Sequence, residues 1–500
     1  MFDIPSIALA SMIISSVVFI TRWFTHPLKS IPTAGRFRFR GLSYLDALYN
    51  TFYAKISMEA GLDKYYGSAF KLAMLDGWMV IVSGPGMIDD LRRRPTHELS
   101  ISDGLLEYMH FDRYLSHASL YDAPHLQAVK MNMTVRKIKT MIPVLVDELR
   151  HVMDDIFPKC SSGWEEVQIF TTMQCVITRM SNRIFVGIPM CRNKEYIELA
   201  TEFPPKSVKR GFLLGLCPHL LKRHVARWLN PFPLAVKQTL PLFSEIIEDR
   251  RSRTMERYDT WEKKPDDVLQ WLIENASEKK HSDADIVESL FLLNLAATHN
   301  TASSLTQAIY HLTERPELIS LLRDEIHPII ATEGWTAESF DKMEKLDSFL
   351  AECQRYDGVG MTSMIRKAMK DITLEDGTIV PEGALVHAAA YAVHHNEASY
   401  PCATKFDALR FLRLRTQADA LGTKYQLTSA SPDYMPFGYG RHACPGRFFA
   451  AIQIKLVLAF MILGFDLCFG GDGTRPENVD LGFNILSDPR GLMLFRQRPD

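Results

Sequence analysis

Residues 437–446 read FGYGRHACPG, and this stretch is the most informative one in the chain. Gly440 and Gly446 lack a Cβ, so we expect the backbone to turn tightly on both sides of Cys444 and to approach a flat cofactor. Pro445 fixes φ at a value that suits the first turn of a helix, and an apolar run follows it. The stretch therefore predicts a small loop that holds one cysteine at the start of a helix.

A cysteine in this position is suited to ligate iron. Backbone N–H groups at a helix N-terminus point towards the sulfur and favour its anionic form, so we expect a lowered pKa for the Cys444 thiol. A thiolate ligand pushes electron density onto a haem iron and promotes cleavage of the O–O bond, and Phe437 would limit water on the same side. The alternative is a buried free cysteine in a glycine-rich turn.

The loop resembles the haem-binding loop of the cytochrome P450 monooxygenases, in the form common among fungal members. The resemblance implies a mainly helical cytochrome P450-like fold with small β-sheets, and haem b as the cofactor. Cys444 would be its axial ligand and the metal ligand of the chain, and His442 would reach a haem propionate from a position more often held by arginine. Four further chain positions are implied to bind the haem or shape its loop: Phe437, Gly440 and Gly446 in the loop, and Arg366. Lys130 stands in for another propionate ligand on an earlier helix, where Leu126 replaces the usual tryptophan.

Glu352 and Arg355 are three residues apart, which places their charges on one helix face, where they can pair. This spacing alone is a weak signal, because Glu248 and Arg251 share it and are expected to form an exposed surface pair. Residues 405–411, KFDALRF, resemble the family segment that carries a second arginine. The resemblance implies a buried triad of Glu352, Arg355 and Arg410 that holds the cysteine loop under the haem.

Residues 283–313 have helical periodicity, and the centre of this helix reads AATHNT at 296–301. Family members have small residues here, followed by an acidic residue and a threonine that hold water and deliver protons. The resemblance makes His299, Asn300 and Thr301 the catalytic candidates, with histidine in the acidic position as in other fungal members. Asn300 departs from the threonine, and Thr301 lies about 100° further around the helix. Alternatively, the three side chains satisfy one another inside a buried helix.

Composition narrows the class of protein. The chain has 500 residues, is 47% apolar and carries 57 basic against 59 acidic residues, so it can bury a large core and has no basic excess for nucleic acid. Its eight cysteines include no Cys-x-x-Cys pair. This pattern predicts reduced thiols that face the cytosol, without a disulfide framework or a zinc site.

The first part of the chain predicts a membrane anchor. Residues 4–20 carry no charge, and basic residues follow them, which by the positive-inside tendency keeps the rest of the chain in the cytosol. We expect a single transmembrane helix over 1–24, a stiff linker over 25–40 and a catalytic domain over 41–500, attached to the endoplasmic reticulum membrane. A cleaved signal peptide is the alternative, but the chain starts MFD and has no basic leader.

Local patterns predict further elements. Residues 71–82 alternate around an Asp-Gly pair at 76–77, which indicates a β-hairpin. Helices are expected over 135–153, 241–257, 266–277, 283–313 and 447–463, and extended chain over 371–389. The basic and apolar segment 204–228 is suited to lie on a membrane, although a solvated helical hairpin fits equally. In the family this region caps the substrate channel.

These features together favour a membrane-anchored haem-thiolate monooxygenase of fungal secondary metabolism. It would oxidise a hydrophobic small molecule, such as a terpenoid, with O2 and electrons from an NADPH-cytochrome P450 reductase. Asn300 suggests a second hypothesis, a haem-thiolate isomerase or dehydratase that does not activate O2. A third is a haem-binding sensor or electron carrier with His299 as a second axial ligand.

Overall fold

The computed structural model describes residues 27–36, 43–75, 77–157, 163–217, 219–255, 264–417 and 424–498. The predicted anchor at 1–24 lies outside these residues, and the predicted linker is described only over 27–36. The chain forms two compact units. The smaller unit contains residues up to 105 together with 361–393 and 480–483, and the larger unit contains 106–360, 394–479 and the residues from 484 onward.

The smaller unit is built around a five-stranded sheet with the order β1-β2-β8-β5-β3. The predicted hairpin is confirmed, because β1 and β2 pair antiparallel from Ala69 opposite Val82 to Met74 opposite Gly77. Strand β8 runs parallel to β2, and the predicted extended segment 371–389 contains β6, β7 and β8. The elements of this unit are η1 (Pro27–Ser30), α2 (Ser43–Tyr65), β1 (Ala69–Met74), β2 (Gly77–Val82), α3 (Pro85–Arg93), β3 (Leu99–Ser100), β5 (Ser363–Ala368), β6 (Ile372–Thr373), β7 (Ile379–Val380) and β8 (Leu385–Ala388).

The larger unit is mostly helical, with a small antiparallel sheet in the order β4-β12-β9. Its helices are α5 (Pro124–Asn132), α6 (Val135–Ile156), α7 (Ile169–Phe185), α8 (Lys194–Gly215), α9 (His219–Leu229), α10 (Phe232–Met255), α11 (Val268–Lys279), α12 (Asp283–Glu314), α13 (Pro316–Glu333), α14 (Ala337–Lys342), α15 (Glu344–Tyr356), α17 (Arg410–Gln417) and α18 (Arg447–Gly464). Shorter elements are η3 (Phe111–Arg113), η4 (Ala118–Asp122), η5 (Met190–Arg192), η7 (Gly440–His442), β4 (Glu165–Gln168), β9 (Phe465–Phe469), β11 (Asn484–Ser487) and β12 (Leu492–Gln497). Three elements, α4 (Ile101–Tyr108), α16 (Ala390–His394) and β10 (Asn478–Leu481), contain residues of both units.

Most of the predicted helices are confirmed. Those expected over 135–153, 266–277, 283–313 and 447–463 are α6, α11, α12 and α18. The predicted first residue of the helix at 241–257 is wrong. The observed helix, α10, begins at Phe232 and contains Pro241 in its interior. The fully buried Phe243 and Ile247 hold the chain in place beyond the proline. Packing therefore offsets the local tendency of proline to begin or break a helix.

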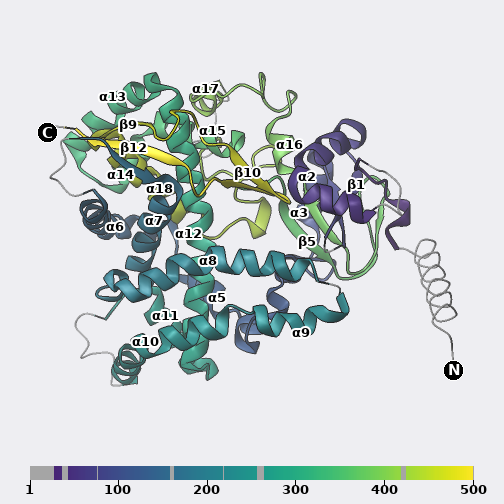
Figure 1. Cartoon of the computed structure of the whole chain (residues 1–500), viewed down its shortest axis with the longest axis horizontal. Coiled ribbons are helices and arrows are strands. Elements are labelled where there is room, and N and C mark those ends of the chain that lie inside the picture. The colour runs from purple at the N-terminus through teal and green to yellow at the C-terminus, as the bar shows by residue number, and fades with distance from the viewer. Residues whose placement is uncertain are drawn as a thin grey trace. The chain divides into compact units, whose positions relative to one another are not determined.

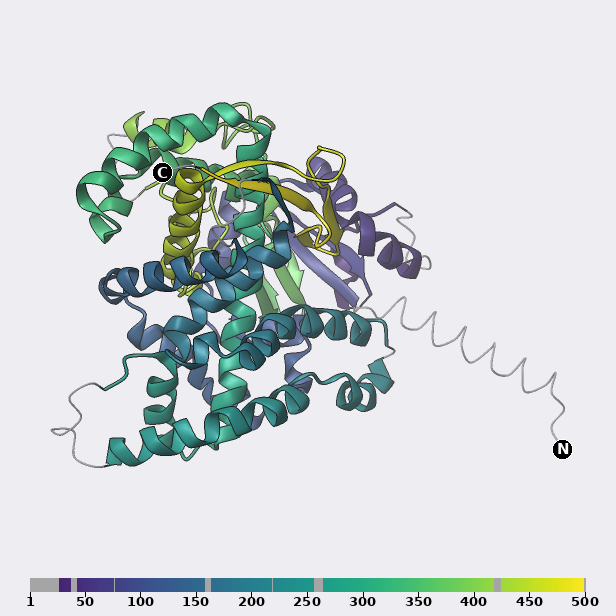
Figure 2. The same ribbon diagram turned by 60° about the vertical axis from the view of Figure 1, so that its left-hand side comes forward.

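The long helix α12 runs through the larger unit beside α7 and α8 (Figures 1 and 2). It begins with a capping box, in which the Ser282 side chain accepts from the backbone of Asp285 and the Asp285 side chain accepts from the backbone of Ser282. Most of its residues are buried, so α12 forms the core against which the other helices pack. A helix in this position is rigid enough to present a functional face.

A buried polar cluster fixes α12 against both neighbouring helices. Asn182 of α7 donates from Nδ2 to Asn294 Oδ1 of α12 at 2.7 Å, and Asn294 donates back at 3.3 Å. The Tyr196 hydroxyl of α8 donates to Asn182 Oδ1 at 2.8 Å. Because these groups are buried, separating the helices would leave polar atoms without partners, which fixes the register of α12.

Within the described ranges, one helix is long and apolar enough to cross a bilayer, and it is α18. More than half of α18 is buried, and it packs against α12 and α13. Its apolar residues therefore serve the core of the larger unit. The mainly helical composition with small sheets agrees with the predicted fold class.

Candidate active site

The loop before α18 turns on two glycines with positive φ, Gly438 at +75° and Gly440 at +82°. The Cys444 backbone N–H donates to the Phe437 carbonyl at 2.8 Å and closes the loop. The expectation that Gly446 supplies a tight turn is wrong, because its φ is −85° and any residue adopts that value. A Cβ at Gly446 would instead lie 3.9 Å from the Cys444 sulfur and narrow the approach to it.

The electrostatics of Cys444 differ from the expectation. The backbone N–H groups of Gly446 and Arg447 hydrogen-bond to the thiol, and the Arg447 charge also favours the thiolate. However, the surrounding protein replaces much of the water around the sulfur, and this larger effect raises the pKa of Cys444 above its usual value. The net direction is therefore opposite to the lowering expected from the helix N-terminus alone.

The residues around Cys444 fit a thiolate-ligated haem. The cysteine keeps exposed surface, two backbone donors face its sulfur, and the neighbouring Gly446 leaves the sulfur approachable. A coordinated metal deprotonates a thiol, so a raised pKa does not prevent ligation. Within the loop, Arg441 Nε lies 3.0 Å from His442 Nε2 and donates to it.

Helix α12 exposes one face in the middle of its buried length. Ala296 and Asn300 are exposed, and because they are four residues apart they lie on the same side of the helix. Thr301 is buried and Thr298 donates to the Asn294 carbonyl at 2.8 Å, so neither threonine lies on this face. Solvent or a bound molecule can therefore reach α12 at Ala296 and Asn300.

His299 lies beside this face. Its ring packs edge-on against Phe170 of α7 with 5.4 Å between ring centroids, and burial lowers the pKa of His299. Among the described residues, nothing hydrogen-bonds to its buried Nδ1. The alternative that the three polar residues of α12 satisfy one another therefore does not hold for this atom.

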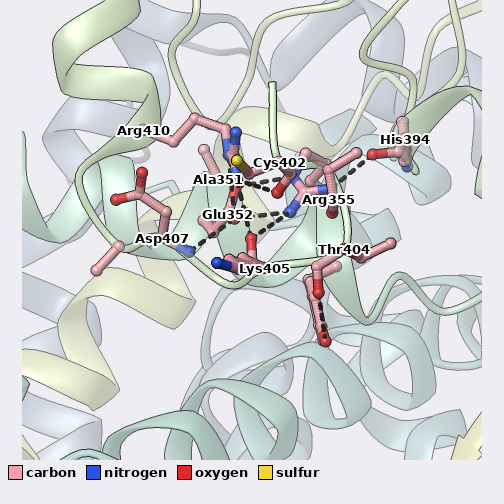
Figure 3. Close-up of polar contacts among 12 residues, drawn as sticks. Ala351, Glu352, Arg355, His394, Cys402, Thr404, Lys405, Asp407 and Arg410 are labelled. Carbon is pink, nitrogen blue, oxygen red and sulfur yellow. Dashed lines mark hydrogen bonds and ion pairs between the residues drawn. The ribbon is translucent and has the colours of Figure 1, made fainter. Parts of the chain in front are cut away.

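The predicted triad is brought together in the larger unit (Figure 3). Glu352 and Arg355 form two hydrogen bonds, of 2.7 and 2.8 Å, and Arg410 Nε lies 3.2 and 3.1 Å from the two Glu352 oxygens. Glu352 and Arg355 are completely buried and Arg410 nearly so. The three residues thus form one buried charge cluster.

The remaining polar atoms of the triad bind backbone groups of the segment before α17. Arg355 Nη1 donates to the carbonyls of His394 at 2.6 Å and Ala403 at 2.8 Å. Arg410 donates to the Pro401 carbonyl at 2.6 Å and to the Lys405 carbonyl at 2.8 Å, and the Asp407 N–H donates to Glu352 at 2.9 Å. A buried charge cluster is tolerated only when its atoms are paired in this way.

The other predicted haem ligands are not brought together by described contacts. Arg366 lies on β5 of the smaller unit, where it is buried and its Nη1 donates to the Ile365 carbonyl at 2.8 Å. Lys130 is an exposed residue near the end of α5. Their roles as propionate ligands stay predictions.

Two histidines were not expected from the sequence. His125 lies on α5, its buried Nδ1 has no hydrogen-bond partner in the described structure, and burial lowers its pKa to about 4. His394 is buried between the triad and the cysteine loop. His125 lies on α5, the helix that carries the predicted propionate ligand Lys130, and it precedes Leu126, which replaces the usual tryptophan. This position in the sequence could have marked His125 as a candidate site residue.

Comparison with known proteins is consistent with this site. The cytochrome P450 family model matches residues 57–494. Similar proteins include cytochrome P450 monooxygenase CYP512U6 of Ganoderma lucidum, 37% identical over 100% of this chain and 97% of the relative, and cytochrome P450 monooxygenase 151 of Postia placenta, 36% identical over 100% of both chains. Ent-kaurene oxidase P450-4 of Gibberella fujikuroi is 28% identical over 88% of this chain and 86% of its own. The structure of retinoic acid bound cyanobacterial CYP120A1 matches with a TM-score of 0.68 and 18% identity, over 94% of this chain and 99% of that chain, which shows the shared fold.

Proposed function

The chain belongs to the cytochrome P450 family, and we propose from its site that it oxidises a hydrophobic small molecule at a haem held by Cys444. Its relatives are monooxygenases, and the family cofactor is haem with a cysteine thiolate as axial ligand. When bound, this group supplies oxygen activation. The substrate gains one oxygen atom of O2, and the other is reduced to water with two electrons and two protons. The observation that carries the proposal is the approachable Cys444 thiol in a loop turned by glycines.

Residues of the chain have three tasks in this reaction. Cys444 supplies the thiolate, and the triad of Glu352, Arg355 and Arg410 keeps the surrounding segment fixed. On α12, Asn300 offers an amide that can both donate and accept a hydrogen bond, so it can hold a water molecule at the exposed face. His299 is neutral because its pKa is lowered, and its unpartnered Nδ1 can take part in moving a proton from solvent.

We further propose that the substrate is a terpenoid or another secondary metabolite and that NADPH-cytochrome P450 reductase supplies the electrons. The 28% identity with ent-kaurene oxidase P450-4 supports the terpenoid class. The small Ala296 on the exposed face of α12 supports a bulky apolar substrate, because it leaves room beside Asn300. Expression with the reductase and a panel of terpene and polyketide scaffolds tests both proposals.

On the substrate found in that panel, Asn300→Thr is expected to retain turnover, because a hydroxyl can still hold water. Asn300→Leu is expected to uncouple the enzyme, with product per NADPH reduced about a hundredfold or more and peroxide formed instead, which is the lower end of what a positioned proton-transfer group contributes. The measurement is product formed and peroxide released per NADPH consumed.

Wild-type protein also decides between this proposal and the isomerase hypothesis. Product formed at full rate with neither NADPH nor reductase would show that O2 is not activated. In that case Asn300 would bind a substrate oxygen, and both Asn300 variants would lose activity. If the product formed per NADPH consumed falls only in Asn300→Leu, the result supports the proposal that the protein is a monooxygenase.

We propose that the protein is anchored in the endoplasmic reticulum membrane with its catalytic domain in the cytosol. Besides the apolar stretch at 4–20, the described helix α2 supports this proposal. Tyr44, Leu48 and Phe52 are exposed and recur every four residues in the part of α2 before its kink at Tyr53, so they form one apolar face. In the larger unit, Trp228 of α9 is 87% exposed and lies among basic residues, which suits a membrane surface.

The proposed topology predicts that neither natural N-glycosylation sequon, at 132–134 or 275–277, is glycosylated, because neither enters the lumen. A sequon-bearing tag placed after Asp500 is expected to stay unmodified, and the same tag before Met1 is expected to be glycosylated. The measurement is the mass shift on endoglycosidase treatment. Modification of the tag after Asp500 would reverse the orientation.

A further inference from the structure

His394 lies between the buried charge cluster and the cysteine loop. It is the last residue of α16 and is buried. Its carbonyl accepts from Arg355 Nη1 at 2.6 Å, and its ring Nε2 accepts from the Met435 backbone N–H at 3.0 Å. His394 therefore contacts the triad through its backbone, and through its side chain it contacts Met435, two residues before the loop.

Met435 continues this connection towards the cysteine. The Gly438 N–H donates to the Met435 carbonyl at 3.0 Å, which forms the turn that Gly438 allows with its positive φ. The Cys444 N–H then donates to the carbonyl of Phe437, the residue before that glycine, at 2.8 Å. A shift of the Met435 backbone would therefore move the carbonyl that holds Cys444.

The hydrogen bond also assigns the protonation state of the ring. Because Nε2 accepts from an N–H, it carries no proton, and the neutral ring must hold its proton on Nδ1. Burial, together with the nearby His395 and Arg355, lowers the pKa of His394 to about 3, which keeps the ring in this acceptor form. A protonated ring could not accept this bond.

We propose that His394 is a positioning residue for Cys444, which couples the Glu352, Arg355 and Arg410 cluster to the loop through the Met435 N–H. The inference goes beyond the family assignment, because it gives a role to a residue outside the loop and the triad. It rests on thiolate ligation by Cys444 and is independent of the substrate. An apolar side chain of similar size would fill the space but would remove the acceptor for the Met435 N–H.

Three variants test the proposal. His394→Leu removes the acceptor, and His394→Gln restores one, since the glutamine amide oxygen can lie near the position of Nε2. The matched control is His395→Leu, the same change one residue on, where the ring instead lies 5.5 Å from that of Tyr356. For each protein, total haem is measured separately from the fraction that gives the red-shifted thiolate band after reduction under carbon monoxide.

In His394→Leu, the ratio of thiolate-ligated to unligated haem is expected to fall about tenfold, the factor that corresponds to one buried hydrogen bond. His394→Gln is expected to stay within about twofold of wild type, as is His395→Leu. If His394→Leu does not accumulate, His394→Asn replaces it, because its shorter amide cannot reach the Met435 N–H.

Three results would overturn the proposal. An unchanged ratio in the leucine or asparagine variant would show that the bond is not needed. Equal losses in the glutamine and leucine variants would assign the effect to ring packing. Loss of total haem while all remaining haem keeps the thiolate band would show a purely structural role. A wild-type protein without the thiolate band would instead refute ligation by Cys444, which separates the two failures.

Discussion

Replacing Cys444 by histidine is expected to abolish the strongly red-shifted Soret band that the reduced wild-type protein gives under carbon monoxide. The shift arises from thiolate ligation, and an imidazole donates less electron density to the iron. Monooxygenase turnover is expected to be lost, since the thiolate ligand promotes cleavage of the O–O bond. The measurement is the spectrum together with product formation in the presence of reductase.

The control for this variant is Cys468→Ser on β9, which also removes a free thiol. It is expected to keep both the band and the activity, because Cys468 lies outside the loop that ends at α18. A Cys444→His protein with the full thiolate band would place the ligand on another cysteine. That result would end the assignment of the loop as the haem site.

Glu352→Gln is expected to prevent the accumulation of haem-loaded protein. The change leaves two arginines in a buried site without their counter-ion, and breaking a buried charge cluster in this way costs about 3–5 kcal/mol. Because the same arginines bind carbonyls of the segment before α17, we expect this segment to lose its fixed conformation. The measurements are the urea midpoint of unfolding and the haem bound per protein molecule.

A matched control is available on α10. Glu248 and Arg251 have the same spacing as Glu352 and Arg355 and lie 3.5 Å apart, but the Glu248 side chain is 71% exposed. Glu248→Gln is therefore expected to cost less than about 0.5 kcal/mol and to leave haem binding unchanged. Equal effects of the two substitutions would show that burial does not set the importance of Glu352.

The sequence predicted those features that depend on local pattern or on a family motif. Helices α6, α11, α12 and α18 follow from periodicity, and the hairpin of β1 and β2 follows from alternation around an Asp-Gly pair. The spacing of Glu352 and Arg355 did not distinguish them from a surface pair. Arg410, 55 residues after Arg355, joined them through the resemblance alone, because pairing at such a separation depends on the fold.

The errors concern properties that arise from neighbours distant in the sequence. The pKa of Cys444 was expected to be lowered by the helix N-terminus, but burial by the surrounding protein has the larger effect. The sequence pattern predicts a helix start at Pro241, but the buried contacts of Phe243 and Ile247 carry α10 through the proline. No local sequence pattern marks His394, because its contacts are with Arg355 and Met435, each about 40 residues away.

The raised pKa of Cys444 has a consequence for the newly made protein before it receives its cofactor. At neutral pH the thiol is protonated, and a protonated thiol is a poor nucleophile that reacts slowly with peroxide and other oxidants. The Cys444 thiol is thus expected to react slowly with oxidants before haem binds. Coordination to iron then removes the proton, so the reactive thiolate forms only once the metal covers it.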